Sequence, residues 1–247
     1  MFQVLLCGAA IVTLSMGIRH GFGLWLAPIT MERGWTRETF SFAMAVQNLA
    51  WGVAGPVAGM LADRYGAWRA LIVGALVYAA GLALMAVSAT GTAFAGSAGL
   101  LVGAAQAGTT YAVIYGVIGR NVPADKRSWA MGVAAAAGSF GQFVMVPVES
   151  WLIGHLNWQN ALFVLAGAVM LIVPLAFGLR EPAYQAGHGP KQSATEAVRE
   201  AFGNRSFLLL TAGYFVCGFQ VVFIGVHMPS YLKDKGLGPE EIGRAHV

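Results

Sequence analysis

The segment Gly59-Met60-Leu61-Ala62-Asp63-Arg64-Tyr65-Gly66-Ala67-Trp68-Arg69 is a short polar turn between two long apolar runs. Gly59 has no side chain, so we expect another backbone to approach it closely. Gly66 tolerates a positive φ, which a tight turn requires. We expect Asp63 and the two arginines of this segment to form a compact charged group where two apolar helices meet.

The composition places these apolar runs in a membrane. Of the 247 residues, 57% are hydrophobic and only 11% are charged, which is far from the average of soluble domains. The runs are continuous and do not alternate with a period of two, so a β-barrel is not expected. A helix needs about 20 largely apolar residues to cross a bilayer, and seven segments meet this requirement: residues 2–28, 39–62, 69–88, 92–118, 128–150, 158–178 and 206–232. The sequence therefore predicts an all-α polytopic membrane protein.

The basic residues predict how the chain is oriented. They are spread over the loops without forming a basic stripe, so the net charge of +4 does not indicate a nucleic-acid partner. The loops after the even-numbered spans hold Arg64, Arg69, Arg120, Lys126, Arg127, Arg180, Lys191, Arg199 and Arg205. The other loops hold Arg33, Arg37, Lys233 and Lys235. Because basic loops are retained in the cytoplasm, we predict a cytoplasmic N-terminus.

The longest polar stretch, residues 181–205, separates the sixth span from the seventh. Ser193 and Glu196 have the spacing of a capping box, so we expect a short amphipathic helix on the cytoplasmic surface. The last seven residues, 241–247, match what a common sequencing adapter would encode. We expect this segment to be an artefact that belongs to no domain.

Arg19 is a charge inside the first apolar run, about 13 Å from its outer end by the helical rise. A guanidinium at this depth is costly unless it faces protein or water, so a functional role is expected. The favoured role is a bidentate grip on an anionic substrate, a carboxylate above all. The alternative is a side chain that snorkels to the outer interface.

Other polar side chains interrupt the spans. His20 either relays a proton or packs in the core. Gln220 and His227 lie seven residues apart on one helix face, where we expect a polar stripe near Arg19. Glu149, near the predicted outer end of the fifth span, could couple protons but is interpreted as an ordinary interfacial carboxylate. The remaining polar groups at mid-span depth either join helices or line a cavity: Gln47, Asn48, Gln106, Thr109, Thr110, Tyr111, Tyr115 and Gln142.

Two rival classes of protein lack their required residues. The sequence has no zinc-protease, phosphate-loop or nucleophile-elbow motif, so neither an enzyme nor a cofactor is expected. Cys7 and Cys217 both lie in apolar runs and indicate neither a disulfide framework nor a metal site. A retinal photoreceptor would need a lysine in the last span, and none lies between Arg205 and Lys233.

The pattern Gly-x-Leu-Ala-Asp-Arg-x-Gly at residues 59–66 resembles the signature loop between the second and third helices of the major facilitator superfamily. The resemblance implies two six-helix bundles that alternate access to a central site. Residues 1–180 would then be the first bundle, 181–205 the linker and 206–240 the first helix of a second half, truncated from a total of twelve. By the same resemblance the turn is a conformational latch formed by Gly59, Asp63, Arg64, Gly66 and Arg69.

Three shorter motifs are similar to bacterial carriers of the monocarboxylate and oxalate/formate type: residues 19–23, residues 34–37, and His227 with Pro229 and Tyr231. Gly103 stands where many proton-coupled members have an arginine, and the fifth span lacks the Gly-Pro motif of drug antiporters. The resemblance implies a multi-pass protein of the bacterial inner membrane that carries small organic anions, with proton coupling as an open question.

That carrier would rely on the missing second half of the chain. The expected substrate site comprises Arg19, His20, Gln106, Tyr111, Tyr115, Gln142, Gln220 and His227. The alternatives are a facilitator for another small solute, or a seven-helix receptor or subunit if the chain is complete.

Overall fold

The computed structural model describes residues 2–179 and 194–236, and all elements in these ranges are helical. The predicted artefact at 241–247 and most of the predicted linker lie outside the described residues. The helices are α1 (Phe2–His20), α2 (Phe22–Arg33), α3 (Arg37–Tyr65), α4 (Ala67–Val87), α5 (Gly91–Phe94), the π-helical η1 (Ala95–Leu101), α6 (Val102–Thr109), α7 (Tyr111–Asn121), the 3-10 turn η2 (Ala124–Lys126), α8 (Arg127–His155), α9 (Trp158–Val169), α10 (Ile172–Phe177), α11 (Ala194–Gly203) and α12 (Arg205–Asp234).

The seven predicted spans are all helical, which confirms the all-α membrane architecture. Six helical stretches among the described residues are long and apolar enough to cross a membrane. The predicted span that is not among them is α3, which has 29 residues and therefore sufficient length. Gln47 and Asn48 in its middle make it less apolar than the other spans.

Three of the predicted continuous spans are broken. The first breaks at Gly21, between α1 and α2. The fourth breaks at Thr110, whose backbone is extended and whose hydroxyl donates to the Gln106 carbonyl at 2.7 Å. A threonine hydroxyl that bonds the preceding turn competes with regular helix geometry. The sixth span breaks between α9 and α10.

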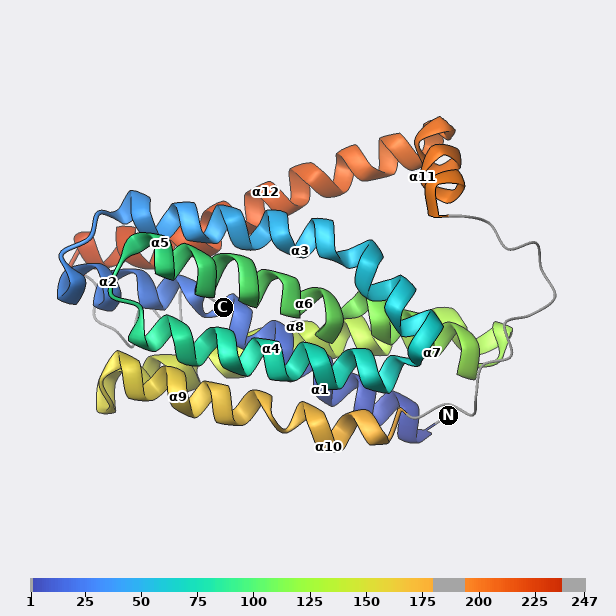
Figure 1. The fold of residues 1–247 in the computed structure, drawn as a ribbon, viewed down its shortest axis with the longest axis horizontal. Helices are drawn as coiled ribbons and strands as arrows, with labels where there is room; N and C mark the ends of the chain where they lie inside the picture. The colour runs from blue at the N-terminus through green and yellow to red at the C-terminus, as the bar shows by residue number, and fades with distance from the viewer. Residues whose placement is uncertain (1, 180–193, 237–247) are drawn as a thin grey trace.

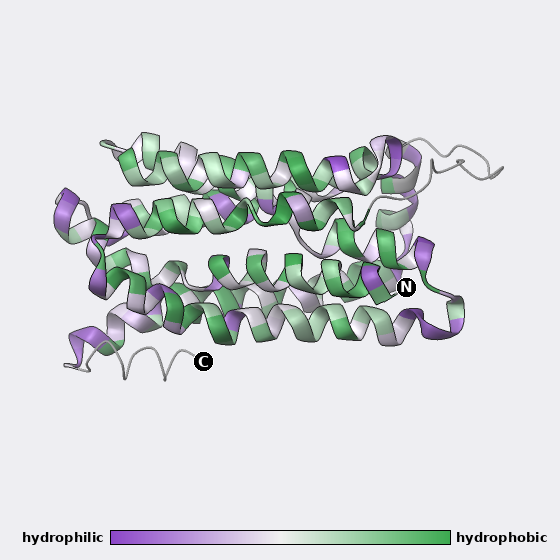
Figure 2. Ribbon diagram, turned by 90° about the horizontal axis from the view of Figure 1, so that it is seen from below, coloured by the Kyte–Doolittle hydropathy of each residue, from purple (hydrophilic) through white to green (hydrophobic). Residues whose placement is uncertain are grey.

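The helices form a bundle in which α1 packs along α8, α4 packs against α6 and α9, and α3 packs against η1 and α6. The loops gather at two ends, with hydrophilic residues at both and apolar residues between them (Figure 2). We call one the Arg37 end, which holds the starts of α3, α5 and α9 (Figure 1). The other is the Arg120 end, which holds the α3–α4 turn, the end of α7 and α11.

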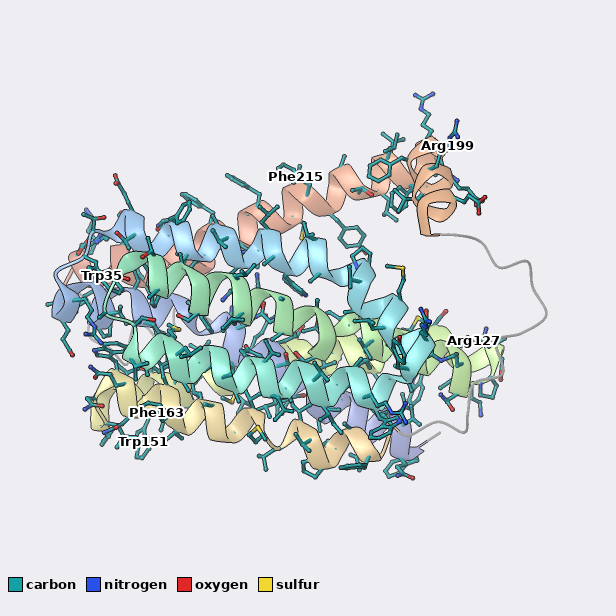
Figure 3. All side chains as sticks on the ribbon, in the orientation of Figure 1. Trp35, Arg127, Trp151, Phe163, Arg199 and Phe215 are labelled. Atoms are coloured by element: carbon teal, nitrogen blue, oxygen red, sulfur yellow. The ribbon has the colours of Figure 1, made fainter. Side chains whose placement is uncertain are left out.

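The last described helix, α12, touches the bundle over part of its length only. It packs against α2 near the Arg37 end, where Val226, Pro229 and Ser230 are buried. Residues 205–220 are all exposed, and this part of α12 rises away from α3 toward α11 (Figure 1). Phe215, labelled in Figure 3, lies on this separated stretch. A short helix, α11, precedes the seventh span; its role as an amphipathic linker helix on the membrane surface stays a prediction.

Candidate functional site

Arg19 lies at the end of α1, where its guanidinium meets two side chains of α3. Nη2 donates to Asn48 Oδ1 at 2.5 Å, and the guanidinium carbon lies 4.5 Å from the centre of the Trp51 ring. Asn48 is oriented by its own donation to the Met44 carbonyl at 2.7 Å. The Arg19 Nε is buried and has no hydrogen-bond partner. Arg19 is therefore held by one hydrogen bond and by one aromatic ring, and its Nε–H donor has no partner.

Trp51 is positioned by the break in the fourth span. Its indole N–H donates to Thr110 Oγ1 at 3.3 Å, and Thr110 is the residue between α6 and α7. The break thus presents a side-chain acceptor at this depth and fixes the ring beneath Arg19. A guanidinium over an indole is stabilised by about 0.5–2 kcal/mol.

A narrow cavity of about 30 Å³ lies beside Arg19. One water needs about 10–15 Å³ of such space, so the cavity has room for little more than water in this arrangement. The helices around it are α1, α2, α3 and α12, which means that α12 closes the site from outside the bundle. The lining residues are Arg19, His20, Phe22, Gly23, Met44, Gln47, Asn48, Val221, Val222, Gly225 and Val226.

Of the predicted site residues, His20 shares this cavity with Arg19. Gln106 does not. Its side chain is fully buried in the bundle, and its Nε2 donates to Tyr78 Oη at 3.4 Å. Gln142 is half-buried on α8 and is absent from the cavity lining.

The rings of Tyr111 and Tyr115 contact each other at a tilt, with their centres 5.3 Å apart. The Tyr111 hydroxyl lies against Gly138 of α8, in space that a Cβ there would occupy. Tyr115 interacts electrostatically with Tyr214, on the separated stretch of α12. The tyrosine pair therefore lies between α7, α8 and α12, nearer the Arg120 end than Arg19.

The structure does not bring the predicted polar stripe of α12 to Arg19. Gln220 and His227 are exposed, and the His227 ring contacts the Phe223 ring with centres 5.1 Å apart. The helix instead presents its apolar face to the cavity, through residues such as Val222 and Val226.

Glu149 does not lie where the sequence predicts. The sequence predicts an interfacial carboxylate, whereas the side chain is fully buried. The helix α8 continues to His155, which places Glu149 about 9 Å inside the helix end by the helical rise. Its Oε2 accepts from the Trp25 indole N–H at 2.8 Å, and its Oε1 is buried without a partner.

Trp51, one of the contacts of Arg19, was not expected to touch it, and Asn48 was expected only to join helices or to line a cavity. The available signal was spacing: Met44, Asn48 and Trp51 follow the i, i+4, i+7 pattern of one helix face. Which helix that face would meet is not a property of the local sequence.

The signature turn differs from the expected charged group. Asp63 accepts from Arg120 of α7 at 2.6 Å. Arg64 and Arg69 instead lie over aromatic rings, those of Tyr65 at 5.3 Å and Trp68 at 5.0 Å. Gly66 has φ +92°, so the predicted positive φ is confirmed. The predicted close approach at Gly59 is wrong, because a Cβ there would meet nothing within 4 Å.

At the Arg37 end, α12 is tied to the bundle by charge and by close packing. Arg37 donates to both carboxylate oxygens of Asp234, at 2.8 and 2.9 Å. Gly23 of α2 lies so near the Gly225 carbonyl that a Cβ on Gly23 would overlap that oxygen. A second cavity, of about 220 Å³, lies between α2, α8 and α12, with Ser150, Ser230 and Lys233 in its lining.

The arrangement is suited to binding an anion. Within residues 2–179 and 194–236 the recorded ion pairs are Arg37–Asp234 and Asp63–Arg120, so Arg19 has no carboxylate partner there. The same ranges contain no group of three His, Cys, Asp or Glu side chains placed to hold a metal ion.

Comparisons with known proteins agree with this architecture. Bovine monocarboxylate transporter 13 is 25% identical over 236 residues, which cover 92% of this chain and 52% of that protein. Mouse monocarboxylate transporter 11 is 26% identical over 93% of this chain and 51% of its own length. The MFS-type transporter YcxA of Bacillus subtilis is 22% identical, with coverages of 87% and 54%. The chain thus spans about half the length of the curated relatives it matches.

The fold is also similar to that of a solved transporter structure, and again this chain covers only part of the other protein. A crystal structure of a D-xylose-proton symporter superposes with a TM-score of 0.70 at 14% sequence identity, over 99% of this chain and 64% of that one. The family model of the Major Facilitator Superfamily matches residues 5–245. The chain belongs to the Major Facilitator Superfamily.

Proposed function

We propose that this chain acts in a secondary transporter of small organic anions, with monocarboxylates as the substrate class and Arg19 as the anchor. The observation that carries the proposal is the buried, unpartnered Nε of Arg19 beside a cavity that α12 closes. A guanidinium inside a membrane bundle without a carboxylate partner is costly to keep. A substrate carboxylate supplies the missing partner.

The geometry around Arg19 leaves one edge of the guanidinium for the substrate. Asn48 occupies Nη2, and Trp51 covers one face. A carboxylate binds best with two parallel N–H donors; Nε–H supplies one, and the N–H of Nη2 that Asn48 does not use supplies the other. The other proposed binding residues do not touch Arg19 here and would meet the substrate only after the helices move: Gln106, Tyr111, Tyr115, Gln142, Gln220 and His227.

The shape of the molecule supports alternating access. The cavity of about 30 Å³ holds no carboxylate with its carbon chain, so binding requires α12 to shift. This helix is fixed at the Arg37 end and stands apart toward the Arg120 end. Basic residues concentrate at the Arg120 end, which we therefore place in the cytoplasm of a bacterium with the N-terminus. The turn of Gly59, Asp63, Arg64, Gly66 and Arg69 would act there as a latch, with Arg120 as its partner.

The experiment measures anion binding to the chain in nanodiscs. The change in Trp51 fluorescence reports binding, and a Trp51→Phe variant gives the background signal. Propionate should bind, and propionamide, which has the same shape without the charge, should not. Charge-assisted hydrogen bonds contribute about 1.5–3 kcal/mol, so Arg19→Gln should weaken propionate at least tenfold. Arg19→Lys keeps the charge but loses the fork, and should retain part of the affinity.

Two results would sink the anchor role: full propionate affinity in Arg19→Gln, or equal affinity for the amide. Binding of an uncharged solute at the same cavity would favour the second candidate, a facilitator for another small solute.

A further inference from the structure

We propose that Glu149 is a proton-binding site whose protonation is linked to anion binding at Arg19. This inference rests on the proposed function. It starts from a carboxyl group enclosed on all sides: Glu149 has no exposed area, and its Oε1 has no hydrogen-bond partner.

The surroundings of Glu149 favour a neutral carboxylic acid. A lone carboxylate removed from water costs several kcal/mol unless a cation pairs with it. The recorded partner is the Trp25 indole N–H, a single neutral donor, which offsets only part of the cost of removing a carboxylate from water. The carboxyl group also lies against Gly21, where a Cβ would overlap it. It therefore occupies the break between α1 and α2, two residues from Arg19.

The charged and titratable groups of the helices packed against Glu149 begin with Arg19 and His20 of α1. From α2 come Glu32 and Arg33, both of which contact Trp158. From α4, Tyr78 interacts electrostatically with both Glu149 and Arg19. The α9 helix has no titratable side chain. The α7 tyrosine nearest to α8 is Tyr111, which lies at Gly138, about 16 Å along α8 by the helical rise. Lys233 of α12 lines the neighbouring 220 Å³ cavity together with Ser150, the residue after Glu149.

Charge counting links the two sites. Arg19 with a substrate carboxylate and a protonated Glu149 sums to zero, and Arg19 with an ionised Glu149 and no substrate also sums to zero. Either ligand alone leaves one net charge inside the bundle, where charge is expensive. Binding of the proton therefore strengthens binding of the anion, and binding of the anion strengthens binding of the proton by the same factor. When the substrate leaves, the proton passes from the Glu149 carboxyl to water.

Linkage fixes the expected behaviour. Because anion binding brings a proton, the affinity for pyruvate should fall by up to tenfold for each unit of rising pH. Pyruvate is the probe because it is ionised throughout the neutral range. Glu149→Gln mimics the protonated acid and keeps an acceptor for Trp25, so its affinity should stay at the acid value at every pH. Glu38→Gln, which removes an exposed carboxylate on α3, is the matched control and should keep the slope.

A second measurement does not depend on the substrate. The infrared C=O band of a protonated carboxyl, recorded on the substrate-free chain in nanodiscs, should appear as the pH is lowered. It should be absent from Glu149→Gln, so the difference between the two spectra isolates it. Trp25→Phe removes the donor without removing the acid, so it should shift that band and keep a pH-dependent affinity. Circular dichroism of each variant checks that the helices are intact.

The outcomes separate this inference from the proposed function. A pH slope that persists in Glu149→Gln overturns the linkage, and a carboxyl band that persists there overturns the proton site. If pyruvate binds the wild-type chain at no pH, the proposed function fails and the linkage fails with it. The infrared band still decides whether Glu149 holds a proton.

Discussion

Gly23 of α2 and Gly225 of α12 form an asymmetric contact: a Cβ on Gly23 would overlap the Gly225 carbonyl, whereas a Cβ on Gly225 would meet nothing within 4 Å. Gly23→Ala should therefore push α12 away from α2 at the Arg37 end, and Gly225→Ala should leave the contact intact. Electron–electron distances between spin labels at residues 36 and 235 would measure this, in a background without Cys7 and Cys217. A longer distance in Gly225→Ala alone would contradict the packing.

The Arg37–Asp234 pair should act as an electrostatic tie at the same end. Both side chains are more than half exposed, at 58% and 52%, so water screens the pair and salt weakens it further. Asp234→Asn should lengthen the same label distance at low salt and converge with the wild type at high salt. The double exchange Arg37→Asp with Asp234→Arg should restore the tie; failure to restore it would show that geometry and not charge holds this end.

The Asp63–Arg120 pair should affect turnover more than affinity. Asp63 is 63% exposed, so Asp63→Asn should change the free energy of unfolding by less than about 1 kcal/mol. If the pair latches the Arg120 end, the same change should alter the rate of anion exchange in vesicles and leave Kd for propionate unchanged. Asp125→Asn, which removes an exposed carboxylate of η2 outside the latch, is the control. An altered Kd with an unaltered rate would argue against a latch.

Gly66 and Gly59 should respond oppositely to alanine. Gly66 has φ +92°, a conformation that costs other residues about 1–3 kcal/mol. Gly59 is helical and faces open space. Thermal unfolding in detergent should show a lower Tm for Gly66→Ala and an equal or higher Tm for Gly59→Ala. Equal losses at both positions would mean that the turn is not where the strain arises.

The sequence was sufficient to predict the helical fold but not the breaks in it. Each predicted span is a run of apolar residues long enough for a bilayer, and every one is helical in the structure. The breaks at Gly21 and Thr110 depend on tertiary partners: a carboxyl group fills the space beside Gly21, and an indole bonds Thr110. A single helix considered alone contains no record of those partners.

The candidate site was predictable only where a residue is unusual by itself. Arg19 is conspicuous because a charge in an apolar run is rare. Gln106 was expected beside it because both lie at mid-span depth, yet Gln106 faces Tyr78. Depth follows from residue number, whereas the direction of a side chain depends on how helices rotate against each other. Glu149 was misplaced for a simpler reason, since α8 continues beyond the apolar run.

Because α12 is attached to the bundle at one end, a small tilt of this helix moves its other end by a large distance. From Gly225 to Arg205 the helix is about 30 Å long at 1.5 Å per residue. A tilt of about 10° around the glycine contact would displace its far end by about 5 Å, roughly the diameter of a carboxylate group, by the same helical dimensions. The glycine contact around which α12 tilts lies beside Arg19, so the tilt moves the atoms there least. A small motion can thus open a broad passage at one end while the anion's anchor barely moves.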